Sequence, residues 1–518
     1  MGGKTGRIGL QERLFSTWEA ELRALGLEGP PSLAQRKERL YREIESLPLR
    51  RKSSSGEWIR RVRKEGGALL VGDYHTLPRA QKAAGKILSL LVKAGSSPLL
   101  MLECFSGRHE KALREWNQGR IGTGTLRART SFDETWGFPW EGYAHLLERA
   151  RRLGVPVLPL EGGSSRRGMA GREREMARRV LRALRARPGR PAFLLVGDLH
   201  LSREGIPSIL DEAGVPTFRI FQNLETVYWD LSSQGSLRKE TWVELGDRTW
   251  CLLETHPLWK LQSAFTWLED RVFQAGKEGP DVALSEKALE LAQAMGEHLG
   301  IALPPYRAPL VFTGDPFPFL DLLHAMKVRA PSRRAFLSQV RACGIYLPPG
   351  RDLVFLVSPS LNFLAEAAAR WLAETAKPAR RSPHTPEGTF LHAVLDHALG
   401  WAGSLLFNPF RARSAGPGAP RGFWPLLDGS RKGFEALGER VRRVPPTERC
   451  FLARRLGRAL GTAIYGVLEQ GIQEESLLGE LFLSRPAGPK GVYTFLSSVL
   501  EKEGILERMG GTAGRSGR

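Results

Sequence analysis

Two stretches of the chain end in the same polar signature, Gly-Asp-x-His. The first, LLVGDYH, spans residues 69–75, and the second, LLVGDLH, spans residues 194–200. In each, an apolar run leads into a glycine, where the backbone can turn tightly because no side chain obstructs it. A third apolar run, LLMLECF, carries a glutamate near its end. The candidate side chains are therefore Asp73, His75, Glu103, Asp198 and His200.

These residue types are the ligand set of a transition-metal site. Imidazole suits zinc, iron or manganese, and carboxylates add charge or serve as a base. A metal held there would acidify a bound water and produce a hydrolytic nucleophile. The alternative is that each histidine only caps a strand end through hydrogen bonds. The duplication of the signature favours the metal site.

The same region also permits porphyrin binding. Haem iron accepts an axial histidine or tyrosine, and Tyr74 stands inside the first signature. The segment FDETWGFPWEGY holds aromatic side chains that could pack against a flat ring. They are Trp136, Phe138, Trp140 and Tyr143. On composition alone, ordinary core packing is the favoured role for these aromatic residues.

A weaker candidate lies in LHAVLDHA, which contains His392, Asp396 and His397. His392 and Asp396 share one helix face at a spacing that metals can use. Because no HExxH pattern is present, a polar edge on an otherwise apolar helix is the favoured interpretation. No Walker A, GxGxxG or GxSxG motif occurs in a convincing context, so nucleotide hydrolysis and serine-hydrolase chemistry lose support.

Buried strands alternating with amphipathic helices are expected to position these side chains. Apolar runs of strand length occur at 68–72, 97–103, 155–160, 192–197 and 216–221. Such alternation predicts an α/β fold, with a mainly parallel sheet core and helices on both faces. The carboxyl ends of parallel strands lie at one edge, where ligands bind, so the candidate side chains are expected to converge there.

The chain of 518 residues is long enough for several domains. We expect a helical N-terminal segment over 1–65, in which RRKSSSG is a flexible connection, and the α/β domain over 66–232. A hairpin and helical extension over 233–330 is expected to precede a mostly helical C-terminal domain over 331–505. A disordered tail is expected over 506–518.

Charge and cysteine content set further expectations. The net charge of +21 favours anionic partners such as nucleic acid, lipid headgroups or carboxylate ligands. The arginines of REREMARRVLRALRAR, near residue 172, are expected to form a solvated helix face. Four scattered cysteines without CxxC spacing predict neither a zinc ribbon nor a disulfide framework, and they favour a reducing compartment. No signal peptide and no run of 18 apolar residues is seen, which predicts a protein without a transmembrane segment.

The order of the motifs resembles the ChaN-like haem-binding uptake domain of the Tiki superfamily. In that family a strand ending in Gly-x-x-His precedes a strand ending in Glu, a Trp-Gly-(Phe)-x-(Trp)-x-x-Tyr segment and a late Gly-x-x-His followed by Gly-(Ile or Val)-Pro. This chain follows that order over residues 66 to about 232. The resemblance implies that His75, Glu103 and His200 form the centre of the site. The first family motif usually carries Glu where this chain has Asp73.

Three functions follow from the residues and the resemblance. ChaN-like members are associated with haem and iron acquisition, so a haem- or iron-type metal-binding protein leads, with a homodimer as one option. Its haem contacts would come from Tyr74, His75, Trp136, Trp140, Tyr143 and His200, and its metal contacts from Asp73, His75, Glu103, Asp198 and His200. Distant relatives, Tiki proteins and erythromycin esterases, are hydrolases, so a metal-dependent hydrolase using His75, Glu103 and His200 is second. A basic interaction protein with an idle site is third.

Family members are often lipoproteins with an export signal and a lipidated cysteine. Neither feature is seen in this sequence, so the expected location is the cytoplasm.

Overall fold

The computed structural model describes most of the chain and divides it into two compact units. Residues 15–268 form what we call the sheet unit, and residues 1–14 with 269–518 form the helical unit. The described residues are 6–24, 31–47, 51–162, 168–237, 240–246, 248–272, 281–328, 332–376, 386–409, 411, 430–468, 482, 490–494 and 496–497. The tail expected to be disordered, 506–518, lies outside them.

The sheet unit is built on an eight-stranded sheet in the order β1-β7-β8-β6-β2-β5-β3-β4. The strands are β1 (Arg51–Ser53), β2 (Ala68–Asp73), β3 (Leu99–Ser106), β4 (Val157–Glu161), β5 (Ala192–Gly197), β6 (Thr217–Gln222), β7 (Thr241–Gly246) and β8 (Thr249–Leu253). Strands β2 to β6 are those expected from the apolar runs, and they pair in parallel. The prediction of an α/β fold with a mainly parallel sheet is confirmed.

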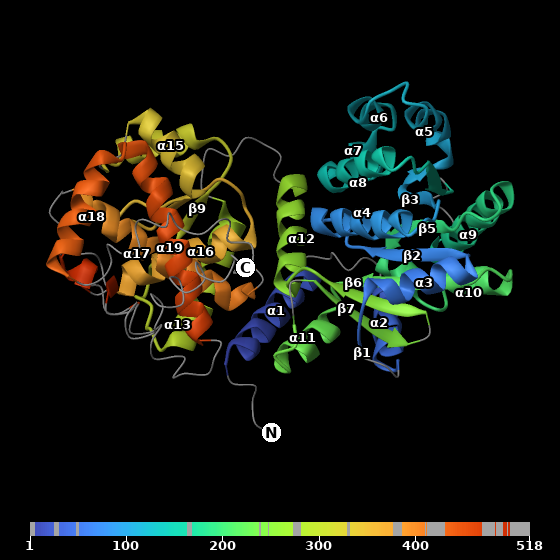
Figure 1. Ribbon diagram of the computed structural model, residues 1–518, viewed down its shortest axis with the longest axis horizontal. Helices are drawn as coiled ribbons and strands as arrows, with labels where there is room; N and C mark the ends of the chain where they lie inside the picture. Colours follow the sequence, from blue (N-terminus) through green and yellow to red (C-terminus); the bar gives the residue numbers. More distant parts are fainter. Residues whose placement is uncertain are drawn as a thin grey trace, which may run out of the picture. The chain divides into compact units, whose positions relative to one another are not determined.

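This part of the chain also contains helices, and the central strands of the sheet are largely apolar and buried. The helices are α1 (Arg7–Ala24), α2 (Pro31–Glu45), α3 (Ser55–Glu65), α4 (Pro78–Lys93), α5 (Glu110–Asn117), α6 (Thr123–Arg129), α7 (Phe132–Thr135), α8 (Trp140–Arg152), α9 (Gly168–Ala186), α10 (Ile206–Glu212), α11 (Glu225–Ser233) and α12 (Pro257–Val272). Every residue of β2, β3 and β6 is buried. Figure 1 shows α4 and α8 packed together on one side of the sheet.

The segment expected to be a flexible connection instead contains strand β1. Arg51 pairs with Glu244 of β7, and the two strands run antiparallel. Arg51 and Lys52 are exposed, as charged residues on an edge strand commonly are. A three-residue strand with this composition has no apolar alternation, so the sequence pattern did not reveal it.

The helical unit combines a small sheet with long helices. The helices are α13 (Val282–Leu299), α14 (Pro316–Ala325), α15 (Arg333–Cys343), α16 (Leu361–Ala376), α17 (Pro386–Phe407), α18 (Arg431–Arg443) and α19 (Pro446–Leu468). The sheet has the order β10 (Ile345–Tyr346), β11 (Leu353–Leu356), β9 (Leu310–Phe312). Helix α17 packs against both α16 and α19. Its stretch Gly388–Phe407 is long and apolar enough to cross a membrane, and most of that stretch is buried inside the protein.

The structure corrects the expectation that the cysteines form no disulfide. Cys343, the last residue of α15, is joined to Cys450 in the first turns of α19. The two residues are 107 positions apart, so only the packing of the helices brings them together. Cys104 and Cys251 are free and buried.

Candidate functional site

The strand ends of the sheet unit line a cavity of about 450 Å³. Strand β2 lies between β5 and β6, and β5 pairs with β3 on its other side, so the two Gly-Asp-x-His signatures and Glu103 meet at one edge. Of the residues singled out in the sequence, the cavity is lined by Asp73, Tyr74, His75, Glu103, Phe138, Asp198 and His200. Their expected convergence is therefore seen in the structure.

His75 is held in place by a buried carboxylate. Its Nδ1 lies 3.0 Å from Oδ2 of Asp73, and the hydroxyl of Tyr143 donates to the same oxygen at 2.7 Å. The other oxygen of Asp73 accepts a bond from Nε2 of Gln81 at 2.5 Å. Burial alone would lower the pKa of His75, but the hydrogen bond and the charge of Asp73 outweigh it and raise that pKa. The side chain of His75 is 22% exposed, so it can be reached from the cavity.

Aromatic rings surround the imidazole of His75. Its ring centroid lies 4.8 Å from that of Trp136 and 4.9 Å from that of Phe138. Phe138 in turn stacks on Trp267 of α12, with centroids 4.9 Å apart. Trp140 has a different place, because it packs edge-on against the buried Phe132 at 4.6 Å. Trp136 and Phe138 therefore contact the imidazole, Trp140 packs on Phe132, and Trp267 contacts Phe138.

His200 has a carboxylate partner on each ring nitrogen. Nε2 lies 3.3 Å from Oε1 of Glu103, and Nδ1 lies 2.9 Å from Oε1 of Glu173 on α9. Its side chain is only 4% exposed. Burial by itself would lower the pKa of His200, but the two carboxylates raise it to about 9. His200 is therefore an imidazolium at neutral pH.

Glu103 contacts His200, Arg172 and the backbone of Gly197. Besides His200, its Oε1 meets Nη2 of Arg172 at 3.0 Å, and its Oε2 accepts the backbone N–H of Gly197 at 2.9 Å. Burial would raise the pKa of Glu103, yet the positive charges of His200, His75 and Arg172 lower it far below its usual value. Arg172 also binds Glu161, at the end of β4, at 2.6 Å.

The expectation of a solvated arginine face on α9 is wrong for Arg172. Arg174 and Arg178 are exposed as expected, whereas Arg172 faces the strand ends and the neighbouring Glu173 is buried. Adjacent helix residues point about 100° apart, and which of them faces the sheet depends on how the helix docks. The sequence therefore gave no signal for either residue of this pair.

Each glycine of the two signatures makes room for a side chain of the other. Strands β2 and β5 pair with Asp73 opposite Gly197, so the two copies are offset by one residue. A Cβ atom at Gly72 would overlap Oδ1 of Asp198. A Cβ atom at Gly197 would lie 3.2 Å from Nε2 of His75 and 3.8 Å from Oε2 of Glu103. The repeated glycines are therefore needed for close approach across the two strands.

A second charged group lines the same cavity. Nζ of Lys260 lies 2.6 Å from Oε1 of Glu225, and it also lies 5.0 Å from the ring centroid of Tyr74. The hydroxyl of Tyr41 donates to Glu225 at 2.8 Å. Burial raises the pKa of Tyr74 to about 12. These residues come from separate segments, and nothing in their local sequence marked Tyr41, Glu225 or Lys260 as neighbours.

Asp198 lines the same cavity and interacts electrostatically with Lys260 and Glu225. In the part of the chain that the structure describes, Oδ1 of Asp198 is buried and has no hydrogen-bond partner. Burial raises the pKa of Asp198 to about 6, against the opposing charge of Lys260. A buried carboxylate oxygen without a hydrogen-bond partner lowers the free energy of unfolding. Asp198 has such an oxygen and also lines the cavity.

Comparison with known proteins gives one match. No curated protein and no solved structure matches the chain. A family model matches residues 60–165 of the chain. This region includes the first signature, Glu103 and the aromatic segment, and it ends before the second signature at 194–200. Residues 60–165 match the family model of haem-binding uptake, Tiki superfamily, ChaN, which confirms the resemblance expected from the order of the motifs.

Proposed function

We propose that the sheet unit binds haem in the cavity at its strand ends, with His75 as the residue that meets the iron. The match of residues 60–165 to a haem-binding uptake family supports a haem- or metal-binding function in general. The finer assignment to His75 rests on the surroundings of that side chain.

The observation that carries the proposal is the way His75 is oriented. Asp73 engages Nδ1 at 3.0 Å, which leaves Nε2 as the nitrogen that can face a ligand. Histidines that bind metals usually donate their other ring N–H to a carboxylate, which fixes the tautomer and makes the ligand more basic. Nε2 lies against Gly197, on the cavity wall. His75 therefore has the arrangement of a metal-binding imidazole.

The apolar part of the lining fits a flat, largely apolar molecule. Phe138 and Trp267 contribute aromatic surface, and the cations Lys37, Arg172 and Lys260 line the same cavity. Further apolar lining comes from Leu22, Leu33, Leu40, Leu224, Leu261 and Ala264. Aromatic and aliphatic walls suit a porphyrin plane, whereas each of these cations already faces a carboxylate, that of Glu19, Glu103 or Glu225. When bound, haem would supply the iron chemistry, while the chain supplies the ligand and its surroundings.

His200 and Glu103 have a positioning role in this proposal. Both ring nitrogens of His200 are engaged by carboxylates, so it does not offer a lone pair. Its charge instead holds Glu103 ionised next to His75. We expect His200 to affect binding through Glu103 rather than by direct contact.

A haem titration followed by the shift of the Soret band tests the proposal. The variants are His75→Ala and His200→Gln, and the matched control is His145→Ala, because His145 is exposed on α8 and does not line the cavity. We expect saturable binding by the wild type and the control, loss of binding in His75→Ala and weaker binding in His200→Gln. Equal binding by His75→Ala and the control would overturn the assignment of His75.

Metal-dependent hydrolysis is the second candidate function, and one observation favours it. A single point on the cavity wall, Gly197, is close to both Nε2 of His75 and Oε2 of Glu103. A histidine and an ionised carboxylate at one place could hold a divalent metal or activate water. Zinc-, manganese- or iron-loaded protein should then cleave an ester or peptide substrate, and Glu103→Gln should abolish the activity. Haem binding without hydrolysis on such panels would exclude this candidate.

A further inference from the structure

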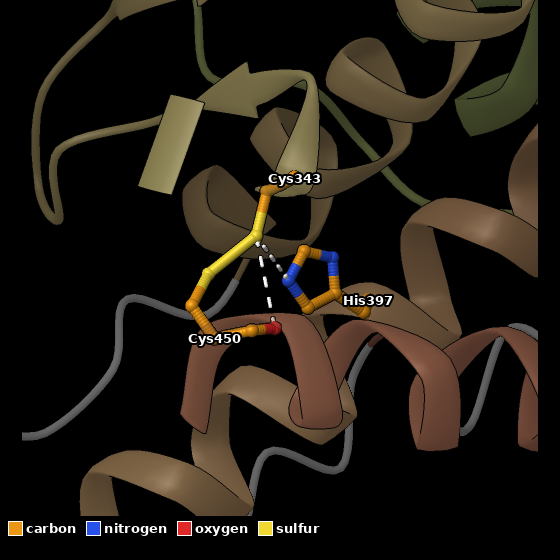
Figure 2. Close-up of side chains that lie close together, drawn as sticks. All are labelled: Cys343, His397 and Cys450. Atoms are coloured by element: carbon orange, nitrogen blue, oxygen red, sulfur yellow. Dashed lines mark hydrogen bonds between the residues drawn. A yellow bond between two sulfur atoms is a disulfide. The ribbon is translucent and has the colours of Figure 1, made fainter. Parts of the chain in front are cut away.

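The helical unit contains a second group of metal-ligand side chains, separate from the strand-end cavity. It consists of Cys343 at the end of α15, His397 on α17 and Cys450 near the start of α19. One ligand atom from each residue lies within 4.8 Å of the others. Figure 2 shows the imidazole of His397 directed at the two sulfur atoms. We call these three residues the Cys-His cluster.

The geometry of the Cys-His cluster is compact and largely buried. Nε2 of His397 lies 3.6 Å from Sγ of Cys343. Cys343 and His397 are buried, and Cys450 is half-buried. The Cα atoms of the two cysteines are 7.0 Å apart. In a tetrahedral zinc site, bond lengths of about 2.3 Å would place the two sulfurs about 3.8 Å apart, so an ion between them needs only small side-chain movements.

The other ring nitrogen of His397, Nδ1, faces a buried carboxylate, as is usual for histidines that bind metals. Its Nδ1 lies 3.8 Å from Oε1 of Glu366, and Glu366 is completely buried. The other oxygen of Glu366 is fixed by Arg411 at 2.5 Å. Among the described residues, neither Nδ1 of His397 nor Oε1 of Glu366 has a hydrogen-bond partner. A small rotation would form the carboxylate–histidine pair that orients metal ligands in proteins.

A guanidinium group lies close to the Cys-His cluster. Arg454 donates to the carbonyl of Ala342, next to Cys343, at 2.6 Å. Nearby guanidinium groups favour thiolate over thiol. Two thiolates and a neutral imidazole balance the charge of a divalent ion.

We propose that, in the reduced chain, Cys343, His397 and Cys450 bind one thiophilic divalent metal ion, for which Zn²⁺ is the probe. A thiol reductant breaks the S–S bond by supplying two electrons and two protons, and it is itself oxidised to a disulfide. Each thiol then releases its proton to solvent when its sulfur binds the metal. The disulfide and the metal site are therefore alternative states of the same residues. Thiolate and imidazole ligands are the set that zinc prefers over magnesium or calcium.

Metal binding would fasten three elements that are distant in sequence. Cys343, His397 and Cys450 belong to α15, α17 and α19. An ion that binds the folded helical unit and not the unfolded chain stabilises the folded state by mass action. In this proposal the ion stabilises the unit in the reduced protein, where no disulfide joins α15 to α19.

The test uses the full chain, reduced and freed of metal under anaerobic conditions. Co²⁺ is titrated as a spectroscopic substitute for Zn²⁺, followed by competition with Zn²⁺. We expect one equivalent of Co²⁺ with sulfur-to-metal charge-transfer bands, displaced by Zn²⁺. Cys343→Ser and Cys450→Ser should lose the bands, and His397→Gln should weaken binding roughly 10-fold or more. His392→Gln, on the same helix, and Cys251→Ser are matched controls that should bind like the wild type.

A second readout uses only the wild-type protein, so it does not depend on whether the variants fold. Zn²⁺ should slow alkylation of Cys343 and Cys450 in the reduced wild type, measured by peptide mass spectrometry, and leave the rate at Cys104 unchanged. The proposal is overturned if the reduced wild type shows no sulfur charge-transfer bands, or if Zn²⁺ leaves the alkylation of Cys343 and Cys450 unchanged. The unreduced protein should bind no Co²⁺ at these residues.

Discussion

His200 and Glu173 share a hydrogen bond of 2.9 Å between Nδ1 and Oε1, although the sequence separates them by a loop and a strand. With Glu103 on the other nitrogen, the imidazolium lies between two carboxylates in the interior of the sheet unit. A charge in this position links protonation to folding.

The first prediction concerns pH. The pKa of His200 is raised to about 9 in the folded protein, above its ordinary value near 6.5. The stabilisation from its charge is therefore complete below about pH 6.5 and is lost as the pH rises towards 9. The free energy of unfolding of wild type minus that of His200→Gln, measured in urea, should fall across this window by roughly 2 to 3 kcal/mol. A difference that stays constant from pH 6 to 9 would contradict the buried imidazolium.

The second prediction concerns Arg172. Its guanidinium neutralises Glu103 and Glu161, so Arg172→Met should lower the denaturation midpoint and weaken haem binding. Arg174→Met is the matched control, because Arg174 lies on the same helix and is exposed. We expect the control to change stability by less than about 0.5 kcal/mol. Equal effects of the two substitutions would restore the solvated-face interpretation of α9.

The third prediction tests the close packing of the two signatures. Gly72→Ala places a methyl group on Oδ1 of Asp198, so the carboxylate must leave its buried position. We expect a loss of roughly 1 to 3 kcal/mol in the free energy of unfolding. Gly124→Ala serves as the control, since a Cβ there meets nothing within 4 Å, and it should be neutral or slightly stabilising. Similar unfolding midpoints for the two variants would refute the predicted overlap.

The fourth prediction concerns the buried pair of Lys260 and Glu225. Lys260→Met leaves a buried carboxylate without its cation, which typically costs about 3 to 5 kcal/mol. The double variant Lys260→Met/Glu225→Gln should recover part of this loss, because the amide keeps the bond from Tyr41 without a charge. Lys82→Met removes the exposed pair with Glu141 and should cost less than about 1 kcal/mol. If the losses measured for Lys260→Met alone and Glu225→Gln alone add up to the loss in the double variant, the two side chains do not interact.

The central strands and their polar ends could be predicted from the sequence. Parallel strands buried on both faces are continuous apolar runs, and a glycine followed by charged residues marks where each run ends. The same rule places Asp73, His75, Glu103, Asp198 and His200 at one edge, because parallel strands share a direction. Local patterns were sufficient here since the signal for each strand lies within its own five to eight residues.

Other features depend on packing between distant segments and had no local signal. Strands β1 and β10 have three and two residues, too few for an alternating pattern. Arg172, Glu173 and Lys260 are ordinary charged residues of amphipathic helices until the docking of each helix is known. The link between Cys343 and Cys450 has the same origin, as does the position of His397. The sequence directed attention to His392 and Asp396, which lie on the same helix as His397.

The two copies of the signature, offset by one residue across β2 and β5, differ in their access to reagents. His75 is 22% exposed and His200 is 4% exposed, so a small imidazole-modifying reagent should acylate His75 first and reach His200 only as the sheet unit opens. The modification rate of His200 would then report local unfolding, and that of His75 would report occupancy of the cavity. Twin motifs in one chain can thus serve as two independent chemical probes of the same molecule.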